Sequence, residues 1–564
     1  MVSRRELIGR MSVIALAATA TDARGQTARR SASAGSALLS ADVPGIQLPA
    51  GKHSVAANIT VRADVMAMPG ATIEIAAGKT LTLLGDFQAP VAPIFTGPGR
   101  VDMNASRAVA AYPEWWGAVR DNSAHDCLPA LRACVAAHPV TLLGAADYFI
   151  SDTWKIETSH RRIWGAGKNW GGPHQGTRII VVSGDRDVVQ LGFDTPPASV
   201  NDYLNSVDFR WMELTRSAPP KASADDGAAG LRMRFTLDCL VEAISADEHA
   251  IGYSVTGAVY THLRDCHAFR SSPGDKSGPQ RFWAFHLDGR TPAAFPGGNA
   301  SLYITDCGAS IGGTPGVPQS IGAYVQGSFA DTYIQNFETS QIATGIKLDG
   351  KTGKPSIDQG RAGQANFHLL MPILDGYSAV GIELTNISPY AAIDIVDPYC
   401  GPAPGAFAGI FIHQARGLVT ISGGQLHGWY DTVNGGNALG IFAQNAEGIG
   451  IIGTKVIGFR RPISFEQCRD FTIDAAINNP GERAAQPAIS LLGCAHGQLR
   501  ARIKGQAGAF PAGIDLRGGN HHLSIDAAGI DPACLGTGVA GRIIGRGDNI
   551  GLAPATIAIS GLSG

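Results

Sequence analysis

Apolar and polar residues follow a repeating pattern along the second half of the chain. A unit of glycine, apolar, variable and apolar residues returns many times, for example as Gly345-Ile346-Lys347-Leu348 and Gly409-Ile410-Phe411-Ile412. The equivalent apolar residues stand at positions 323, 346, 382, 410, 441, 463, 489 and 514. Within each unit, two or three short runs alternate apolar and polar residues with period two, which indicates β-strands with one buried face.

A unit of roughly two dozen residues cannot bury its apolar face alone, so successive units must stack. Stacking pairs each strand with the same strand of the next turn and encloses a narrow apolar core between long parallel sheets. Asn386, Asn445 and Asn478 fall where bends are expected, because asparagine tolerates left-handed backbone. The pattern predicts an all-β chain, a single-stranded right-handed parallel β-helix, and its spacing excludes leucine-rich repeats and propellers.

Length, composition and charge agree with this fold. A chain of 564 residues is too long for one compact core, whereas a repeat architecture grows without a larger one. The 72 glycines and the low charged fraction of 16% suit short strands joined by tight turns. The formal net charge of −2 gives no basic field, so no nucleic-acid partner is expected.

Nine cysteines are present, and none of them form the close pairs that mark zinc or redox sites. Asp238-Cys239, Asp265-Cys266 and Asp306-Cys307 repeat one small pattern. Equivalent positions in a stacked coil lie above one another, so we expect buried structural thiols.

The amino-terminal residues 1–25 have the character of an export signal. Ser3-Arg4-Arg5-Glu6 precedes an apolar run from Met11 to Ala20, which resembles a twin-arginine signal. No other apolar run reaches the ~20 residues that span a bilayer, so no membrane partner is expected. The predicted location is periplasmic or extracellular.

Four segments are predicted in chain order. After the export signal, residues 26–118 form an amino-terminal β-rich segment, and residues 119–534 form the β-helix. Stretches rich in proline, glycine and charge near 271–299 and 350–364 predict loop insertions. Residues 535–564 are predicted to form a last turn and cap.

The front of the chain resembles right-handed parallel β-helix proteins of the pectate-lyase-like superfamily, which includes pectate lyases, phage tailspikes and exopolysaccharide-active proteins. The resemblance covers about residues 45–180 in order and is looser beyond. The segments that carry it are Ile46 to His53, Gly78 to Gly85, Pro113-Glu114-Trp115-Trp116-Gly117-Ala118 and Ile163 to Gly167. It implies a carbohydrate-active protein whose partner is a polysaccharide, as a monomer or a homotrimer.

One part of the chain departs from that resemblance. The acidic loop of such proteins has a glycine-aspartate-glycine core, but here it is Asp121-Asn122-Ser123-Ala124-His125-Asp126, which puts a metal role for this loop in doubt. Behind it, Leu128, Leu131 and Val135 have helical spacing and predict an amphipathic helix that caps the open end of the coil.

The densest group of chemically active side chains stands in one predicted strand and its following turn. With period two, Tyr260, His262 and Arg264 share a face, where they supply a phenol, an imidazole and a guanidinium. With Asp265 and His267 these residues are candidates for the base, proton relay and carboxylate neutraliser of a β-elimination. The alternative is a solvated face with incidental polar residues.

A second set of candidates suits hydrolysis, which needs two carboxylates beside the glycosidic bond. Glu338, Asp375 and Asp397 stand near strand ends in successive turns, as do Asp331 and Asp394. Stacking brings such residues close in space. The alternative for each is turn formation, since aspartate before glycine or proline commonly shapes a bend.

Candidate substrate-binding residues are mostly aromatic, because aromatic rings stack on sugars; the alternative is packing against the coil. They are Arg270, Tyr377, Tyr399, His427, Trp429 and Tyr430.

The sequence thus predicts a lyase that cleaves an acidic, uronate-containing exopolysaccharide, with a glycoside hydrolase or a non-catalytic glycan-binding surface protein as alternatives. No cofactor and no metal ligands are predicted, although a lyase would admit a divalent cation such as calcium.

Overall fold

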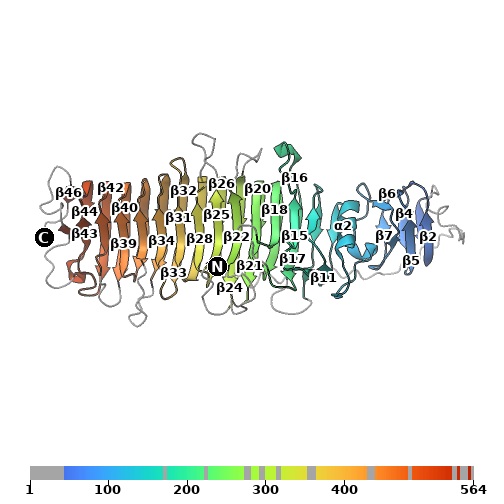
Figure 1. The fold of residues 1–564 in the computed structure, drawn as a ribbon, viewed down its shortest axis with the longest axis horizontal. Helices are drawn as coiled ribbons and strands as arrows, with labels where there is room; N and C mark the ends of the chain where they lie inside the picture. The colour runs from blue at the N-terminus through green and yellow to red at the C-terminus, as the bar shows by residue number, and fades with distance from the viewer. Residues whose placement is uncertain are drawn as a thin grey trace.

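The structure is a computed structural model of the chain. It describes residues 43–168, 175–220, 227–271, 281–290, 299–312, 319–351, 364–428, 439–479, 486–535, 543–545 and 557–560. The described strands stack into a long rod, with a small amino-terminal coil at one end (Figure 1).

The amino-terminal strands form three short coils with a core of their own. They pair in parallel as three three-stranded sheets: β1 Gly45–Leu48 with β4 Asp64–Ala67 and β7 Phe87–Gln88; β2 Gly51–Val55 with β5 Ala71–Ile75 and β8 Phe95–Thr96; and β3 Ile59–Val61 with β6 Thr80–Leu83 and β9 Arg100–Asp102. Alternate residues such as Leu48, Ile73 and Leu81 are buried, as period two requires. The segment predicted to be β-rich is therefore itself a short β-helix.

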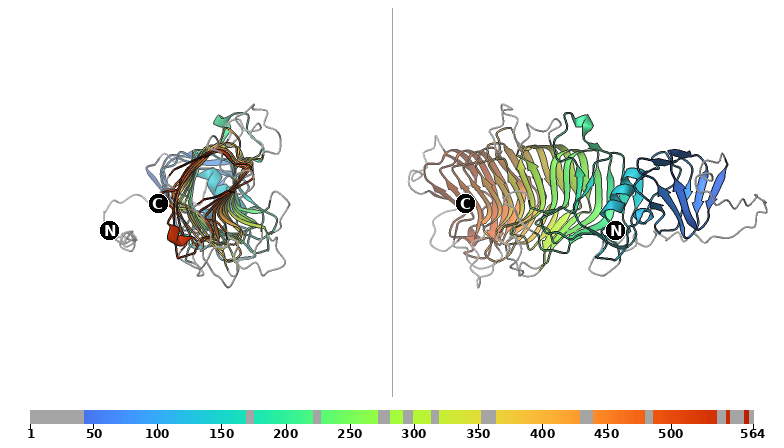
Figure 2. Two further views of the ribbon diagram at one scale, coloured as in Figure 1. Left: turned by 90° about the vertical axis from the view of Figure 1, so that its left-hand side faces the viewer. Right: turned by 45° about the vertical axis from the view of Figure 1, so that its right-hand side comes forward.

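Helix α2 Leu128–Ala137 and the 3₁₀ turn η2 Pro113–Trp116 join this amino-terminal β-helix to the main β-helix. Leu131 and Val135 of α2 belong to the main core, whereas Cys134 and Ala137 belong to the amino-terminal core. Seen along the rod, α2 lies within the outline of the coil (Figure 2). The predicted capping helix thus closes the main core on one side and the small core on the other.

The main coil has three faces, each a column of parallel strands. The first face contains β10 Val140–Leu142, β13 Arg162–Trp164, the starts of β17 Asp208–Arg216 and β19 Leu240–Asp247, the end of β20 Ile251–Arg264, β23 Ala300–Thr305, β26 Phe329–Gln335, β29 Gln364–Leu370, β32 Ala392–Val396, β35 Leu418–Ser422, the starts of β38 Ile449–Ile457, β40 Arg469–Asn479 and β42 Ala495–Gly505, β44 His521–Asp526 and β46 Ile557–Ser560. The second face contains β11 Ala146–Ile150, β14 Thr177–Val181, the ends of β17 and β19, β21 His267–Arg270, β24 Gly308–Ile311, β27 Glu338–Ser340, β30 Ile373–Tyr377, β33 Tyr399–Pro402, β36 Gln425–His427 and the ends of β38, β40 and β42. The third face contains β12 Trp154–Ile156, β15 Val189–Gly192, β18 Ala229–Leu237, the start of β20, β22 Arg281–Gly289, β25 Gln319–Gly327, β28 Thr344–Asp349, β31 Val380–Thr385, β34 Ala408–His413, β37 Leu439–Gln444, β39 Arg461–Glu466, β41 Ile489–Leu492, β43 Ile514–Arg517 and β45 Ile543–Gly545. The short strand β16 Leu204–Asn205 pairs with the end of β18, and the 3₁₀ turns η3 Val200–Asp202 and η5 Pro532–Cys534 lie outside the columns.

The strand register confirms the repeat found in the sequence. On the third face, Ala323 pairs with Ile346, which pairs with Ile382, and the column continues through residues 410, 441, 463, 489 and 514. Every one of these side chains is completely buried. Because each inward apolar side chain packs on its equivalent in the neighbouring coil, this column fixes the register between one coil and the next.

Two sequence expectations about the coil need correction, and a third lies mostly outside the described residues. The loop predicted near 271–299 contains strand β22, in which Phe282, Phe285 and Leu287 belong to the core. The prolines and glycines on both sides of this short apolar strand made the whole segment resemble a loop in the sequence. Asn386 and Asn445 have positive φ at bends as expected, but Asn478 lies inside β40. Of the loop near 350–364, residues 352–363 lie outside the described residues.

All nine cysteines are free and buried, in agreement with structural thiols. Cys266 and Cys307 lie one above the other, with the Cys266 amide 3.4 Å from the Cys307 Sγ atom. Cys239 lies at a different corner, because Leu240 pairs with His262 on the first face. Burial raises the pKa of Cys400 to about 12, so this thiol stays protonated and unreactive.

We expect the core stack to dominate stability. Phe285 is completely buried, 4.5 Å from the Tyr253 ring, whereas Phe269 points outward with 36% of its surface exposed. Phe285→Ala should lower the free energy of unfolding by about 3–5 kcal/mol through lost burial and cavity formation. Urea unfolding followed by circular dichroism measures the change, with Phe269→Ala as the matched control. Equal losses in the two variants would contradict this description of the core.

Candidate functional site

Four aromatic and imidazole rings line up along the outer surface of the first face, and we call them the ring ladder. They are His262, Tyr303, Tyr333 and His368, and each pairs in register with the next across neighbouring strands. The ring centroids are 4.6, 5.4 and 4.6 Å apart, and the planes differ by 10°, 6° and 18°. In-register stacking of the coils therefore produces a row of groups at an almost constant spacing.

The geometry of the ladder determines how it can meet a ligand. Because the rings lie face to face, their faces cover one another, and the polar edges are left to face solvent. Tyr303 and Tyr333 are half-buried, and within the described residues neither hydroxyl has a hydrogen-bond partner. The ladder is thus a comb of hydrogen-bonding groups rather than a set of stacking platforms.

At the His368 end of the ladder, hydrogen bonds connect the ring to neighbouring side chains that include the carboxylates of Asp394 and Asp331. His368 Nδ1 lies 3.1 Å from a carboxylate oxygen of Asp394, and His368 Nε2 lies 3.2 Å from the Asn366 side-chain oxygen. Asn366 in turn donates to Asp331 at 2.8 Å. Both ring nitrogens of His368 therefore face oxygen acceptors.

The other end of the ladder opens into a hollow of about 450 Å³. The position before His262 in the column is Leu240, and the positions before that are Asp208 and Arg162. All three residues line the hollow. The hollow lies where this column carries Arg162, Asp208 and Leu240 in place of rings.

The structure places the predicted Tyr260, His262 and Arg264 at the end of β20, with all three side chains exposed. His262 and Arg264 point outward and are exposed. Tyr260 has a φ of 46° and lies at the corner that leads into this face, with 58% of its surface exposed. Exposure still alternates through this segment, because Thr261 and Leu263 are buried between the three exposed side chains, so Tyr260, His262 and Arg264 all point outward as predicted.

His262 and Arg264 have environments that suit different roles. Partial burial lowers the pKa of His262, and the nearby Arg264 charge lowers it further. The imidazole is therefore neutral at pH 7 and able to accept a proton. The Nε atom of Arg264 donates to Glu242 at 2.7 Å, while half of the arginine side chain stays exposed.

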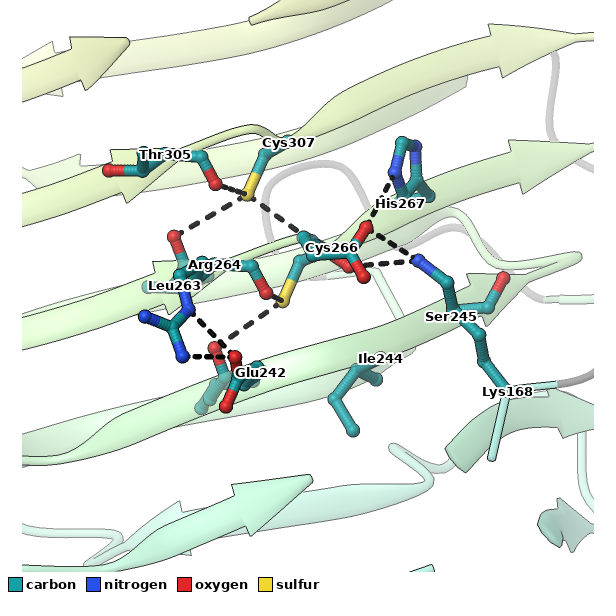
Figure 3. Close-up of polar contacts among 12 residues, drawn as sticks. Lys168, Glu242, Ile244, Ser245, Leu263, Arg264, Cys266, His267, Thr305 and Cys307 are labelled. Atoms are coloured by element: carbon teal, nitrogen blue, oxygen red, sulfur yellow. Dashed lines mark hydrogen bonds and ion pairs between the residues drawn. The ribbon is translucent and has the colours of Figure 1, made fainter. Parts of the chain in front are cut away.

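Asp265 stands between β20 and β21, at the corner between the first and second faces, and His267 begins β21. Figure 3 shows His267 and Lys168 on the same side of this corner. Lys168 crosses two coils to reach Asp265, with its Nζ atom 2.7 Å from a carboxylate oxygen, and His267 Nε2 lies 3.4 Å from the same oxygen. Burial raises the pKa of Asp265, but the contacts with His267 and Lys168 outweigh burial and leave it below its ordinary value. Asp265 is thus an ionised anchor for Lys168 and His267.

Two of the three predicted carboxylates come together on the second face. Glu338 pairs with Ile373 and Ser340 pairs with Asp375, so Glu338 and Asp375 are diagonal neighbours on adjacent strands, and both are exposed. Such neighbours are about 7–8 Å apart between Cα atoms. Asp397 instead has a φ of 48° at a bend, where it accepts the Gly424 amide at 3.0 Å.

The structure buries two of the predicted substrate-binding residues and leaves two others partly exposed. Tyr377 is completely buried in the core and Arg270 is 8% exposed, with its guanidinium donating to the Arg281 carbonyl oxygen at 2.9 Å. A buried ring and a buried guanidinium cannot meet a sugar, so both predictions are wrong. Tyr399 and His427 are partly exposed on the second face. Trp429 and Tyr430 lie outside the described residues.

Sequence reasoning missed Tyr303, Tyr333 and His368 as partners of His262. The signal was present, since each residue stands two positions before the end of an alternating run, but a polar aromatic at one strand position has no meaning until its register is known. Among the described residues, no group of three or more His, Cys, Asp or Glu side chains is placed to hold a metal ion. None of the described helices is long and apolar enough to cross a bilayer.

A buried carboxyl group lies on the second face, two strands from His267 and one from Arg178. Glu213 is 7% exposed, and burial together with the neighbouring Asp247 raises its pKa to about 7. Arg178 compensates it only partly because the guanidinium Nε donates to Asp147 at 2.7 Å. Glu213 therefore holds a proton in the folded chain over a pH range in which the unfolded chain has lost it.

This raised pKa predicts how stability depends on pH. The contribution of Glu213 is complete below its ordinary pKa of 4.5 and is lost as the pH rises through about 7. Glu213→Gln, which cannot ionise, should match the parent chain at pH 4 and exceed its stability by up to about 3 kcal/mol at pH 8. Urea unfolding across this range provides the measurement, with exposed Glu157→Gln as control. A constant difference between parent and Glu213→Gln would refute the assignment.

Comparisons with known proteins identify the fold. No family model and no curated protein matches the sequence. A double mutant of the tailspike protein of E. coli bacteriophage HK620 matches with a TM-score of 0.51 and 10% identity, over 78% of this chain and 76% of that chain. The A-module of a mannuronan C-5 epimerase from Azotobacter vinelandii matches with a TM-score of 0.43 and 11% identity, over 80% and 98%. A surface adhesin of Streptococcus pneumoniae matches with a TM-score of 0.40 and 10% identity, over 74% and 92%. The tailspike likeness confirms the predicted right-handed parallel β-helix.

Proposed function

We propose that this chain is a carbohydrate-active enzyme that binds a polysaccharide along the first face and cleaves it there. The observation that carries the proposal is the ring ladder. Its polar edges recur every 4.6–5.4 Å along the rod. A ligand that meets such a comb at every step must itself repeat at nearly the same interval, and an extended polysaccharide does.

The reaction that this face supports best is β-elimination at a uronate unit. That reaction needs a base for the proton next to the carboxylate and a cation that neutralises the carboxylate. His262 is neutral at pH 7 and exposed, and the half-exposed Arg264 stands two residues further on the same strand. The Tyr303 hydroxyl on the adjacent strand is a donor for the leaving oxygen.

Hydrolysis is the second candidate, and two observations favour it. Glu338 and Asp375 are exposed diagonal neighbours on adjacent strands, and they supply the pair of carboxyl groups that hydrolysis requires. Exposed carboxylates such as Asp238 and Asp331 also border the first face. A neutral glycan tolerates that charge better than a polyuronate does.

Export and assembly belong to the same proposal. The twin-arginine pattern in residues 1–25 would place the enzyme in the periplasm or outside the cell, where polysaccharides are found. A homotrimer, as an alternative to a monomer, would present three such faces.

Two readouts separate the mechanisms. The chain is incubated with a panel of acidic and neutral polysaccharides while absorbance of unsaturated uronate and reducing ends are followed. A lyase raises both signals, and a hydrolase raises reducing ends alone. Neither signal for any polysaccharide would refute catalysis and leave a binding protein.

Substitutions then identify the residues. His262→Ala and Arg264→Ala should each lower kcat/KM by at least about a hundredfold, since a positioned base contributes roughly 10²–10⁴-fold. Activity should also fall as the pH drops through the His262 pKa, which lies below the ordinary 6.5, because the base becomes protonated. His522→Ala and Arg502→Ala, exposed on distant coils, are matched controls. If His262→Ala keeps full activity and Glu338→Gln loses it, the catalytic residues lie on the second face and the assignment to His262 is wrong.

A further inference from the structure

We infer that the hollow at the amino-terminal end of the ring ladder is a binding subsite for a uronate unit of the polysaccharide. Its volume is about 450 Å³, within the roughly 300–1,000 Å³ of typical ligand sites. The inference rests on the proposed function in one respect, namely that a polysaccharide lies along the first face and reaches the hollow. The contacts that define the subsite do not involve the proposed catalytic residues.

The floor of the hollow is apolar and its rim is polar. Val140 and Leu240 line it from two strands of the first face, and His160, Arg162 and Asp238 line it as exposed polar residues. A sugar ring has the same division, with C–H groups on its faces and hydroxyls around its edge. The hollow therefore matches a pyranose in shape and in polarity.

Arg162 indicates that the bound sugar carries a carboxylate. Within the described part of the chain Arg162 has no ion-pair partner, whereas Asp208, the next residue in its column, accepts two hydrogen bonds from Arg210. Of the two carboxylates that line the hollow, Asp238 has no cation partner among the described residues, and it accepts a hydroxyl hydrogen bond from Ser206 at 3.2 Å. Arg162 is thus available for a bidentate contact with a ligand carboxylate, and Asp238 for a sugar hydroxyl.

The register fixes where this subsite lies relative to the proposed cleavage point. Arg162 pairs with Asp208, Asp208 with Leu240, and Leu240 with His262. Three strand steps of ~4.8 Å separate Arg162 from His262, or about 14 Å along the rod. A chain that places one sugar on each coil would put a uronate in the hollow three units from the one at His262.

The test uses small probes, so it does not depend on knowing the polysaccharide. Glucuronate and glucose are titrated separately into the full chain, and binding is measured by calorimetry and by saturation-transfer NMR of the sugar. Glucuronate should bind at least about tenfold more tightly than glucose, because a charge-assisted contact contributes more than a neutral one. Arg162→Ala should abolish that preference.

Two further variants locate the site. Leu240→Phe keeps Arg162 and fills the hollow, so it should weaken both sugars alike. Arg502→Ala removes an equally exposed arginine from a distant coil and should change nothing. Thermal unfolding confirms that each variant is folded.

The outcomes keep the subsite and the proposed function apart. Glucuronate binding that depends on Arg162 upholds the subsite, even if His262→Ala leaves activity intact and the catalytic assignment fails. No glucuronate binding, or binding that Arg162→Ala and Leu240→Phe leave unchanged, overturns the subsite, even if the chain cleaves polysaccharide through His262.

Discussion

The structure depends on one constraint, the in-register parallel pairing of each strand with the same strand of the next coil. Each pairing places a residue about 4.8 Å from its equivalent in the neighbouring coil, so any position of the coil becomes a column along the rod. On the inside, the column from Ala323 to Ile514 is apolar and completely buried. Because a slip of one residue would turn every side chain of a strand to the opposite face, the buried columns hold the exposed columns in place.

The same constraint built the candidate site. His262, Tyr303, Tyr333 and His368 come from four coils and span more than a hundred residues, yet they lie ring to ring because their strands pair in register. These residues are on strands rather than on loops, and packed strands hold side chains with little freedom. Ion pairs such as Arg264 with Glu242 and Lys168 with Asp265 fix the charged groups around the ladder. The surface is therefore organised before a ligand arrives.

Period-two alternation predicted the coil and much of the first face, and it failed at Tyr377, where the backbone leaves the extended region. Tyr260, His262 and Arg264 all point outward as the alternation requires, although the left-handed backbone of Tyr260 places it at the corner that leads into the face. Tyr377 follows Gly376, whose φ is 64°, and the register shifts between Asp375 and Tyr377, which turns the tyrosine into the core. The left-handed residue Tyr260 has no residue pattern that marks it in advance, whereas Asp375-Gly376 is a turn pattern that the sequence does display. The ladder was missed for a different reason, since loops of unequal length hide which residues share a column.

The fixed spacing of the ring ladder would also favour ligands whose repeat matches it. The ladder spacing is set by backbone pairing and cannot adjust to a ligand of another period. A polymer whose repeat differs by about 0.5 Å per unit drifts by about 1.5 Å over the three steps of the ladder, beyond the ~0.5 Å within which binding groups must be held. A flexible glycan absorbs such a mismatch only by bending, at a cost in conformational freedom. Under the proposed function, discrimination between polysaccharides on this face would therefore arise from the interval between sugars as much as from any single contact. A short oligosaccharide, which accumulates little drift, should be distinguished less well than a long one.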